Sequence, residues 1–270
     1  MRFLVGIALM VATAAPSPAL AAGTMGSGNG SGGQTGGTIT AGVQFGSPPA
    51  AKGKTDTKGC TWQPLVELQT LTISVTEKMV NGIKYVLFYR QCPTSGLAYW
   101  VPQIPPAHLG TNAAAAVEER LPSPRVGSAP PADRVVVNVG MWLWTNPAQY
   151  QPVSVTAWVP TTAGIAWATT TATPIRLVFV SGEPGASPMS CQGPGREWLP
   201  QYGDELASPC MYTYQHSSEI TASNVFDATL SIVWSVRWTS NVGAGGSLGE
   251  YTTSTNQPIT VNEIQAIVGG

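Results

Sequence analysis

The sequence predicts a mainly β protein, with a small hairpin-plus-helix region followed by a β-sandwich. Over most of residues 132–270, short runs rich in Val, Thr and Trp alternate apolar and polar side chains, as half-buried strands do. Turns that contain Gly and Pro separate these runs, a spacing typical of sandwiches. One stretch, about residues 107–121, places its apolar residues instead at helical spacing.

Residues 1–21 have the three parts of a secretory signal peptide. Arg2 supplies the positive charge, residues 3–15 are apolar, and Ala19 and Ala21 form an A-x-A cleavage site. This apolar run is too short to span a bilayer, which needs about 20 residues. No longer apolar stretch follows, so we expect no transmembrane segment after cleavage. The mature chain is then secreted, extracellular or associated with the cell wall.

Residues 22–59 are rich in Gly and Ser and carry few apolar side chains. Such a segment cannot bury enough apolar surface to fold alone, so a flexible, disordered linker is predicted here.

Four cysteines, an even number, suit the oxidising conditions that exported proteins meet. Cys60, Cys92, Cys191 and Cys210 can pair in three ways, and proximity in sequence favours Cys60–Cys92 and Cys191–Cys210. A zinc site formed by Cys191 and Cys210 together with His216 is the alternative for the second pair, but no closely spaced cysteine pair supports it.

Residues 60–131 form the predicted hairpin-plus-helix region, stapled by a disulfide. Asn81-Gly82 favours a tight hairpin turn because both of its positions require positive φ. Alternating runs flank this turn, with Leu71, Ile73 and Val75 before it and Tyr85, Leu87 and Tyr89 after it. The helix over about 107–121 begins after Pro105-Pro106 and ends before Pro122.

Residues 132–270 form the predicted sandwich domain. The strands expected from alternation lie at about 153–159, 165–173, 175–180, 230–238 and 259–267. A long loop is expected at 181–208 and a Gly-rich turn at 243–249.

The charge balance excludes one class of partner and offers little material for catalysis. The 270-residue chain has 13 Lys and Arg, 14 Asp and Glu, and a net charge of −1, which excludes a basic nucleic-acid surface. No motif of a hydrolase, metalloprotease or nucleotide-binding protein is present, so no catalytic residue, metal or cofactor is predicted. A hydrolase that uses Asp204, Glu205 or His216 stays open as a minor alternative.

The nine tryptophans are the main candidates for recognition. Trp142 and Trp144 fall on one face of a predicted strand, as do Trp234 and Trp238, and Trp198 lies in the long loop. Large aromatic side chains fill sandwich cores, and this is the simpler interpretation, above all for Trp234. Exposed tryptophans would instead form a platform for a glycan or a partner protein, with Trp142, Trp144 and Trp198 as candidate binding residues.

The C-terminal region resembles polycystic kidney disease (PKD) domains, which are immunoglobulin-like β-sandwiches. Residues 175–180 lead into the turn 181–185, residues 210–214 match the family's tyrosine strand, and residues 228–236 match its alternating strand. The aspartates of the family's turn are absent, with Glu183 nearby instead.

Most of the mature chain is similar to uncharacterised exported actinobacterial proteins with a PKD-like C-terminal region. The matching pieces follow the same order, at residues 60–62, 89–92, 100–102, 121–124, 142–144, 149–152, 191–210, 234–238 and 261–266. This resemblance implies an accessory role at the cell envelope, beside a pilus or secretion apparatus. We therefore expect a non-enzymatic exported protein with a structural or protein-interaction role and an envelope or extracellular protein partner. The alternative is a carbohydrate-binding module that uses exposed tryptophans.

Overall fold

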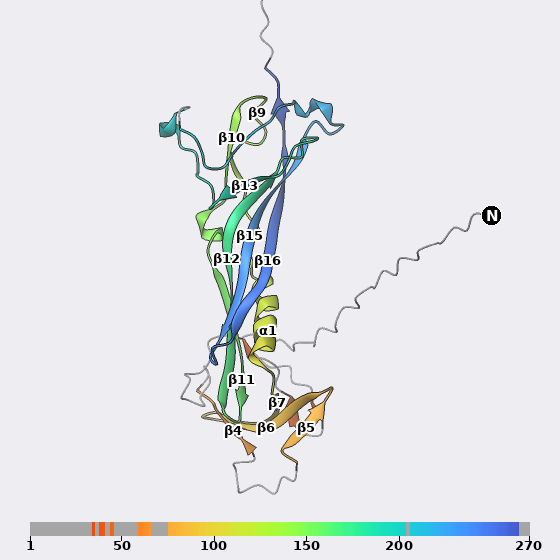
Figure 1. Ribbon diagram of the computed structural model, residues 1–270, viewed down its shortest axis with the longest axis vertical. Coiled ribbons are helices and arrows are strands. Elements are labelled where there is room, and N and C mark those ends of the chain that lie inside the picture. The colour runs from red at the N-terminus through yellow and green to blue at the C-terminus, as the bar shows by residue number, and fades with distance from the viewer. Residues whose placement is uncertain are drawn as a thin grey trace, which may run out of the picture.

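The computed structural model describes residues 34–35, 38–40, 44–45, 59–65, 75–203 and 206–264. The predicted signal peptide, residues 1–21, lies outside these ranges. The predicted mainly β class with a small helix is confirmed. Figure 1 shows an elongated molecule whose longest strands run along its length, with a smaller sheet at the lower end.

One antiparallel sheet forms the body of the molecule, in the strand order β16-β15-β12-β11-β3. Its strands are β3 (Gln44–Phe45), β11 (Val153–Thr161), β12 (Gly164–Val180), β15 (Phe226–Ser240) and β16 (Gly245–Ile259). Strand β13 (Met189–Gln192) pairs with the upper part of β12. A continuous hydrophobic core lies against one face of this sheet, called the inner face below, which is covered by a helix and by a second, smaller sheet.

Two predicted boundaries in this sheet are wrong. The segments 165–173 and 175–180 are one strand, because a bulge between Pro174 and Arg176 lets the proline lie within the ladder. The turn predicted at 243–249 is mostly strand, because β16 starts at Gly245 and pairs along β15 as far as Ile259. Backbone pairing to a long neighbour outweighs the low strand propensity of these glycines. Of the strand predicted at 259–267, Ile259 ends β16, Val261–Asn262 form a separate two-residue strand, and residues 265–267 lie outside the described residues.

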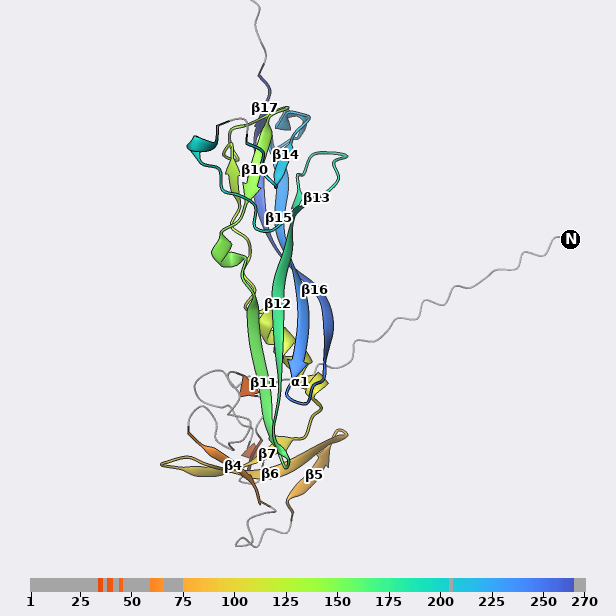
Figure 2. The same cartoon turned by 60° about the vertical axis from the view of Figure 1, so that its left-hand side comes forward.

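Helix α1 (Pro106–Glu118) covers the lower half of the inner face (Figure 2). Pro106 is the first residue of the helix, one position before the predicted start, and the helix ends at Glu118, before Leu121, the predicted last residue. Gly110 lies so close to Trp238 that an added Cβ would stand 2.8 Å from the indole. The Thr170 hydroxyl also donates to the Gly110 carbonyl at 2.7 Å, so the missing side chain allows a close helix-to-sheet contact.

A three-stranded sheet covers the upper half, in the order β14-β10-β8. These strands are β8 (Gly127–Ala129), β10 (Gly140–Trp144) and β14 (Met211–Thr213). Tyr212 packs edge-on against Phe179 of β12, and Tyr214 stacks on Phe226 of β15, each with ring centroids 5.4 Å apart. The upper half is thus sheet on sheet, as in a sandwich.

The lower sheet contains the predicted hairpin, formed by β5 (Glu77–Val80) and β6 (Ile83–Gln91). Asn81 and Gly82 both have positive φ, 50° and 76°, so the turn prediction is confirmed. The first hairpin strand differs from the prediction, because it begins at Glu77 and leaves out Val75, while Leu71 and Ile73 lie outside the described residues.

The remaining strands of this sheet are β4 (Thr61–Pro64), β7 (Gly96–Pro102), β1 (Gln34–Thr35) and β2 (Thr38–Thr40). Strands β1, β2 and β3 come from the Gly-rich segment 22–59, and β2 pairs in parallel with β7. At the upper end, β9 (Val135–Val136) and β17 (Val261–Asn262) form a parallel pair. Within the described ranges, no helix has the length and hydropathy needed to cross a bilayer.

Candidate functional site

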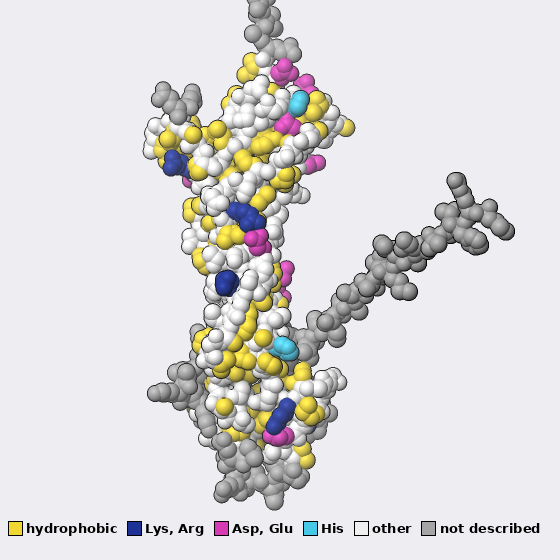
Figure 3. Space-filling view, in the orientation of Figure 1, with side chains coloured by type: hydrophobic (Ala, Val, Ile, Leu, Met, Phe, Trp, Pro, Cys, Tyr) yellow, Lys and Arg dark blue, Asp and Glu magenta, His cyan; other side chains and the backbone are white. Residues whose placement is uncertain are grey.

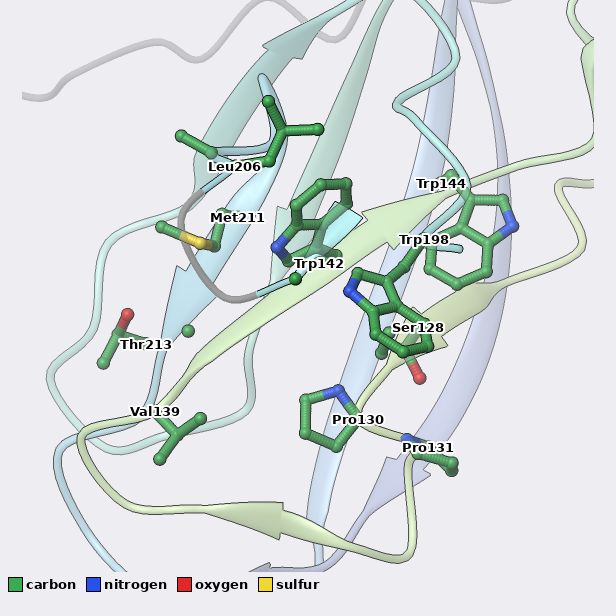
Figure 4. Close-up of a pocket in the computed structure, with 14 residues that line it drawn as sticks. Ser128, Pro130, Pro131, Val139, Trp142, Trp144, Trp198, Leu206, Met211 and Thr213 are labelled. Carbon is green, nitrogen blue, oxygen red and sulfur yellow. The ribbon is translucent and has the colours of Figure 1, made fainter. Parts of the chain in front are cut away.

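A pocket of about 800 Å³ lies on the outer face of the β14-β10-β8 sheet, under the loop that follows β13. Figure 4 shows Trp142, Trp144 and Trp198 together around this pocket. The structure therefore brings all three candidate binding residues to one place. The other lining residues are Ser128, Ala129, Pro130, Pro131, Val139, Gly140, Gly203, Leu206, Ala207, Met211 and Thr213.

Strand alternation places two of the tryptophans. Met141 and Leu143 point into the core and are fully buried, so Trp142 and Trp144 point to the opposite face. Trp142 is only 6% exposed, yet it is not part of the core clusters, because loop residues cover it from outside. Its ring lies parallel to that of Tyr202, with 6.1 Å between centroids. Neither sequence interpretation of Trp142, core or exposed platform, describes this position fully.

Two glycines make room for Trp144. A Cβ on Gly127 would collide with the indole ring of Trp144, and a Cβ on Gly195 would collide with the Leu143 carbonyl. Gly195 also has a φ of 78°, which favours glycine. The loop is bonded to β10 at the same point, where the Thr145 N–H donates to the Pro194 carbonyl at 2.8 Å. The Trp144 ring therefore lies against the β8 backbone at Gly127, and the loop lies against the backbone of β10 at Leu143 and Trp144.

The Cys191–Cys210 disulfide joins the two ends of this loop, from β13 to the start of β14. The Cys60–Cys92 disulfide joins the residue before β4 to the residue after β6, the second strand of the hairpin. Both predicted pairings are confirmed, and the zinc alternative is wrong because Cys191 and Cys210 are bonded to each other. Trp198, in the middle of the closed loop, is half-buried. Asp204 and Glu205 of the same loop lie outside the described residues.

A buried carboxylate fastens β14 to the end of β12. Glu183 accepts hydrogen bonds from the Tyr212 hydroxyl at 2.8 Å, the Gln215 and His216 backbone N–H groups at 2.9 Å, and His216 Nδ1 at 2.9 Å. Burial by itself raises the pKa of Glu183, but the hydrogen bonds from these three residues outweigh it and lower the pKa on balance. The ionised carboxylate thus fixes the strand that carries Met211 and Thr213 into the pocket.

Two tyrosines complete this network. The Tyr214 hydroxyl donates to the Ser181 carbonyl at 3.0 Å. Burial raises the pKa of Tyr212 and of Tyr214, so both hydroxyls stay protonated and serve as donors.

His216, the histidine of the hydrolase alternative, faces Glu183 but does not line the pocket. Its side chain is 61% exposed. Within the part of the chain that is described, no group of three or more His, Cys, Asp or Glu side chains is placed to hold a metal ion. The Glu183 carboxylate does orient the His216 imidazole. The described residues that line the pocket, however, include no titratable side chain that could act together with this pair.

Several pocket residues were not predicted as site residues. No pattern in the sequence singled out Pro130, Pro131 or Met211, or Tyr202, which stacks on Trp142 without being a lining residue. The described lining contains no charged side chain, in line with the scarcity of charge over the visible surface in Figure 3.

Comparison with known protein families, with curated proteins and with solved structures finds no match to this chain. The resemblances to PKD domains and to exported actinobacterial proteins therefore remain predictions. What the pocket binds has to follow from the chemistry of its own side chains.

Proposed function

We propose that this chain is a non-enzymatic exported protein that binds a protein partner at or outside the cell envelope, and that the tryptophan pocket is its recognition site. The observation that carries the proposal is the convergence of Trp142, Trp144 and Trp198, from a strand and a distant loop, on one cavity. A volume of about 800 Å³ is within the usual range of ligand sites, roughly 300–1,000 Å³.

Two further features support this function. Tryptophan is enriched at the centres of protein interfaces, where it buries a large area at low entropy cost. The two disulfides fit an oxidising compartment, and Cys191–Cys210 reduces the freedom of the loop that carries Trp198. The loop is thus held in place for binding before a partner arrives.

Site-specific photo-crosslinking in the producing cell tests the proposal. A photoreactive amino acid at Val139, which lines the pocket and is 44% exposed, should give a covalent adduct with one envelope protein. The same probe at Val242, which is 65% exposed and does not line the pocket, serves as the control. The Val139 adduct should disappear in the Trp198→Ala background. Equal adducts from both positions, or none from Val139, would count against the proposal.

A neutral glycan is the second candidate ligand, because the Trp198 ring is half-buried and no charged side chain stands in the described lining. Sugars stack on such rings through their apolar faces. Retention on insoluble polysaccharide, lost in Trp198→Ala and kept in Trp167→Ala, would support this candidate. Absence of retention by the unsubstituted protein would remove it.

A further inference from the structure

The hydrogen-bonding groups of the pocket are unevenly divided between donors and acceptors. Among the described lining residues, the polar side-chain groups are the three indole N–H groups and the hydroxyls of Ser128 and Thr213. An indole N–H only donates, and the described lining has no carboxylate, amide or imidazole to accept. A ligand that fits this pocket therefore offers carbonyl oxygens, few N–H groups and apolar surface.

Two of the indole donors are directed into the pocket. Figure 4 shows the ring nitrogens of Trp142 and Trp198 turned toward the side that Val139, Met211 and Thr213 line. The nitrogen of Trp144 turns the other way, against the backbone of Gly127. In the described part of the chain, the Trp142 and Trp198 N–H groups have no hydrogen-bond partner. Both donors are thus available to a ligand.

We infer that the pocket binds an uncharged, proline-rich segment of the partner protein in the polyproline II conformation, an inference that rests on the proposed function. Proline residues supply a backbone carbonyl without an N–H, which matches the donor-only indoles. Their flat, apolar rings pack against aromatic walls, and the extended helix is formed before binding, so little entropy is lost.

The alternatives match the lining less well. A glycan carries many hydroxyl donors, and the described pocket side chains offer only the two hydroxyls to accept from them. A charged peptide would leave its charge without a counter-charge in an apolar site, which is costly. Among the described lining residues none is charged, and this favours an uncharged segment.

Titration with a defined peptide tests this inference. Acetyl-hexaproline-amide added to the intact, oxidised protein should change the tryptophan fluorescence and give a measurable heat of binding. An acetylated, amidated Gly-Ser hexapeptide, cellohexaose and chitohexaose should give neither signal. If a hexasaccharide binds and hexaproline does not, the inference is overturned in favour of the glycan.

Substitutions separate stacking from hydrogen bonding. Trp142→Phe and Trp198→Phe keep an aromatic ring but remove the N–H, and each should weaken hexaproline binding by about 2- to 12-fold. Trp167→Phe, half-buried on β12 and outside the pocket, should leave the affinity unchanged. If the covered Trp142 variant fails to fold, as shown by near-ultraviolet circular dichroism, Trp198→Phe still decides. Affinity that neither variant lowers would overturn the role of the indole donors.

The two proposals can fail separately. If hexaproline does not bind but the Val139 crosslink forms and depends on Trp198, the inference is wrong and the proposed function stands. If neither is observed, both are wrong.

Discussion

The two halves of the inner sheet face are covered in different ways. In the lower half, α1 packs on β12 through small residues, with Gly110, Ala113 and Ala114 buried on the helix and Ala168 and Ala172 buried on the strand. In the upper half, the β14-β10-β8 sheet packs through tyrosine and phenylalanine rings and adds the Glu183 network and a disulfide. Small residues bring the helix and the sheet into close contact, whereas β10 points Trp142 and Trp144 away from the core, where they line the pocket. Binding capacity therefore belongs to the half with the bulky residues.

The largest expected difference between the halves comes from the aromatic layer. Tyr214→Ala removes a fully buried ring and the donor to the Ser181 carbonyl, so it should lower the free energy of unfolding by about 3–5 kcal/mol. Urea denaturation followed by circular dichroism measures the change. Tyr214→Phe, the control, should lose only the hydrogen bond, about 1 kcal/mol. Equal losses for both variants would mean that the ring contributes little.

The loop disulfide should come next in size. The paired substitution of Cys191 and Cys210 by serine opens a loop with a sequence separation of 19, and the expected loss is about 3 kcal/mol. The pocket should lose affinity for any ligand as well, since the loop holds Trp198. Differential scanning calorimetry of this variant, with and without hexaproline, measures both effects. An unchanged unfolding temperature would show that the bonds between the loop and β10 are sufficient alone.

Glu183 gives the upper half a pH dependence. Its folded pKa lies below the ordinary value of 4.5, so the network stabilises the protein above that pH and this stability is lost as pH falls through the folded pKa. Glu183→Gln should lower stability by about 2 kcal/mol at neutral pH and flatten the pH profile below 4.5. Urea midpoints measured from neutral to acidic pH test this.

Glu250 is the matched control for Glu183. A hydrogen bond from Arg176 also lowers the pKa of Glu250, but this pair lies at the surface. Glu250→Gln should change the profile only slightly, and salt should remove its effect but not that of Glu183. A salt-sensitive Glu183 profile would argue against the buried network as its origin.

The smallest effect is expected in the lower half. Gly110→Ala adds a Cβ against Trp238, and overpacking of about 1–3 kcal/mol outweighs the roughly 1 kcal/mol gained in helix propensity. The net loss should be about 1 kcal/mol by urea denaturation. Ala115→Gly, at an exposed position of the same helix, measures propensity alone. A stabilised Gly110→Ala variant would show that Trp238 moves aside freely.

Local chemistry made some features predictable and not others. The Asn81-Gly82 turn, the Pro105-Pro106 helix start and the two disulfide pairings depend on residues close in sequence, and all are confirmed. The extent of β16 was not predictable, because its glycines become strand residues only through pairing with β15.

For the candidate site, alternation placed Trp142 and Trp144 on one face, as the structure shows. The proximity of Trp198 to Trp142 and Trp144 depends on the path of a loop closed by a disulfide, and no local sequence pattern predicts that path. The stacking of Tyr202 on Trp142 has the same origin. The identity of candidate residues could thus be read from sequence, but their assembly into a pocket could not.

The orientation of the long strands has a mechanical consequence. Strands β12, β15 and β16 run along the long axis, with the hairpin sheet at one end and the tryptophan pocket toward the other (Figure 1). The hydrogen bonds of an antiparallel ladder lie perpendicular to its strands. Tension between the two ends therefore loads these bonds in shear, so that many must break together instead of opening one at a time. The molecule resists stretching along its length far better than peeling from its side.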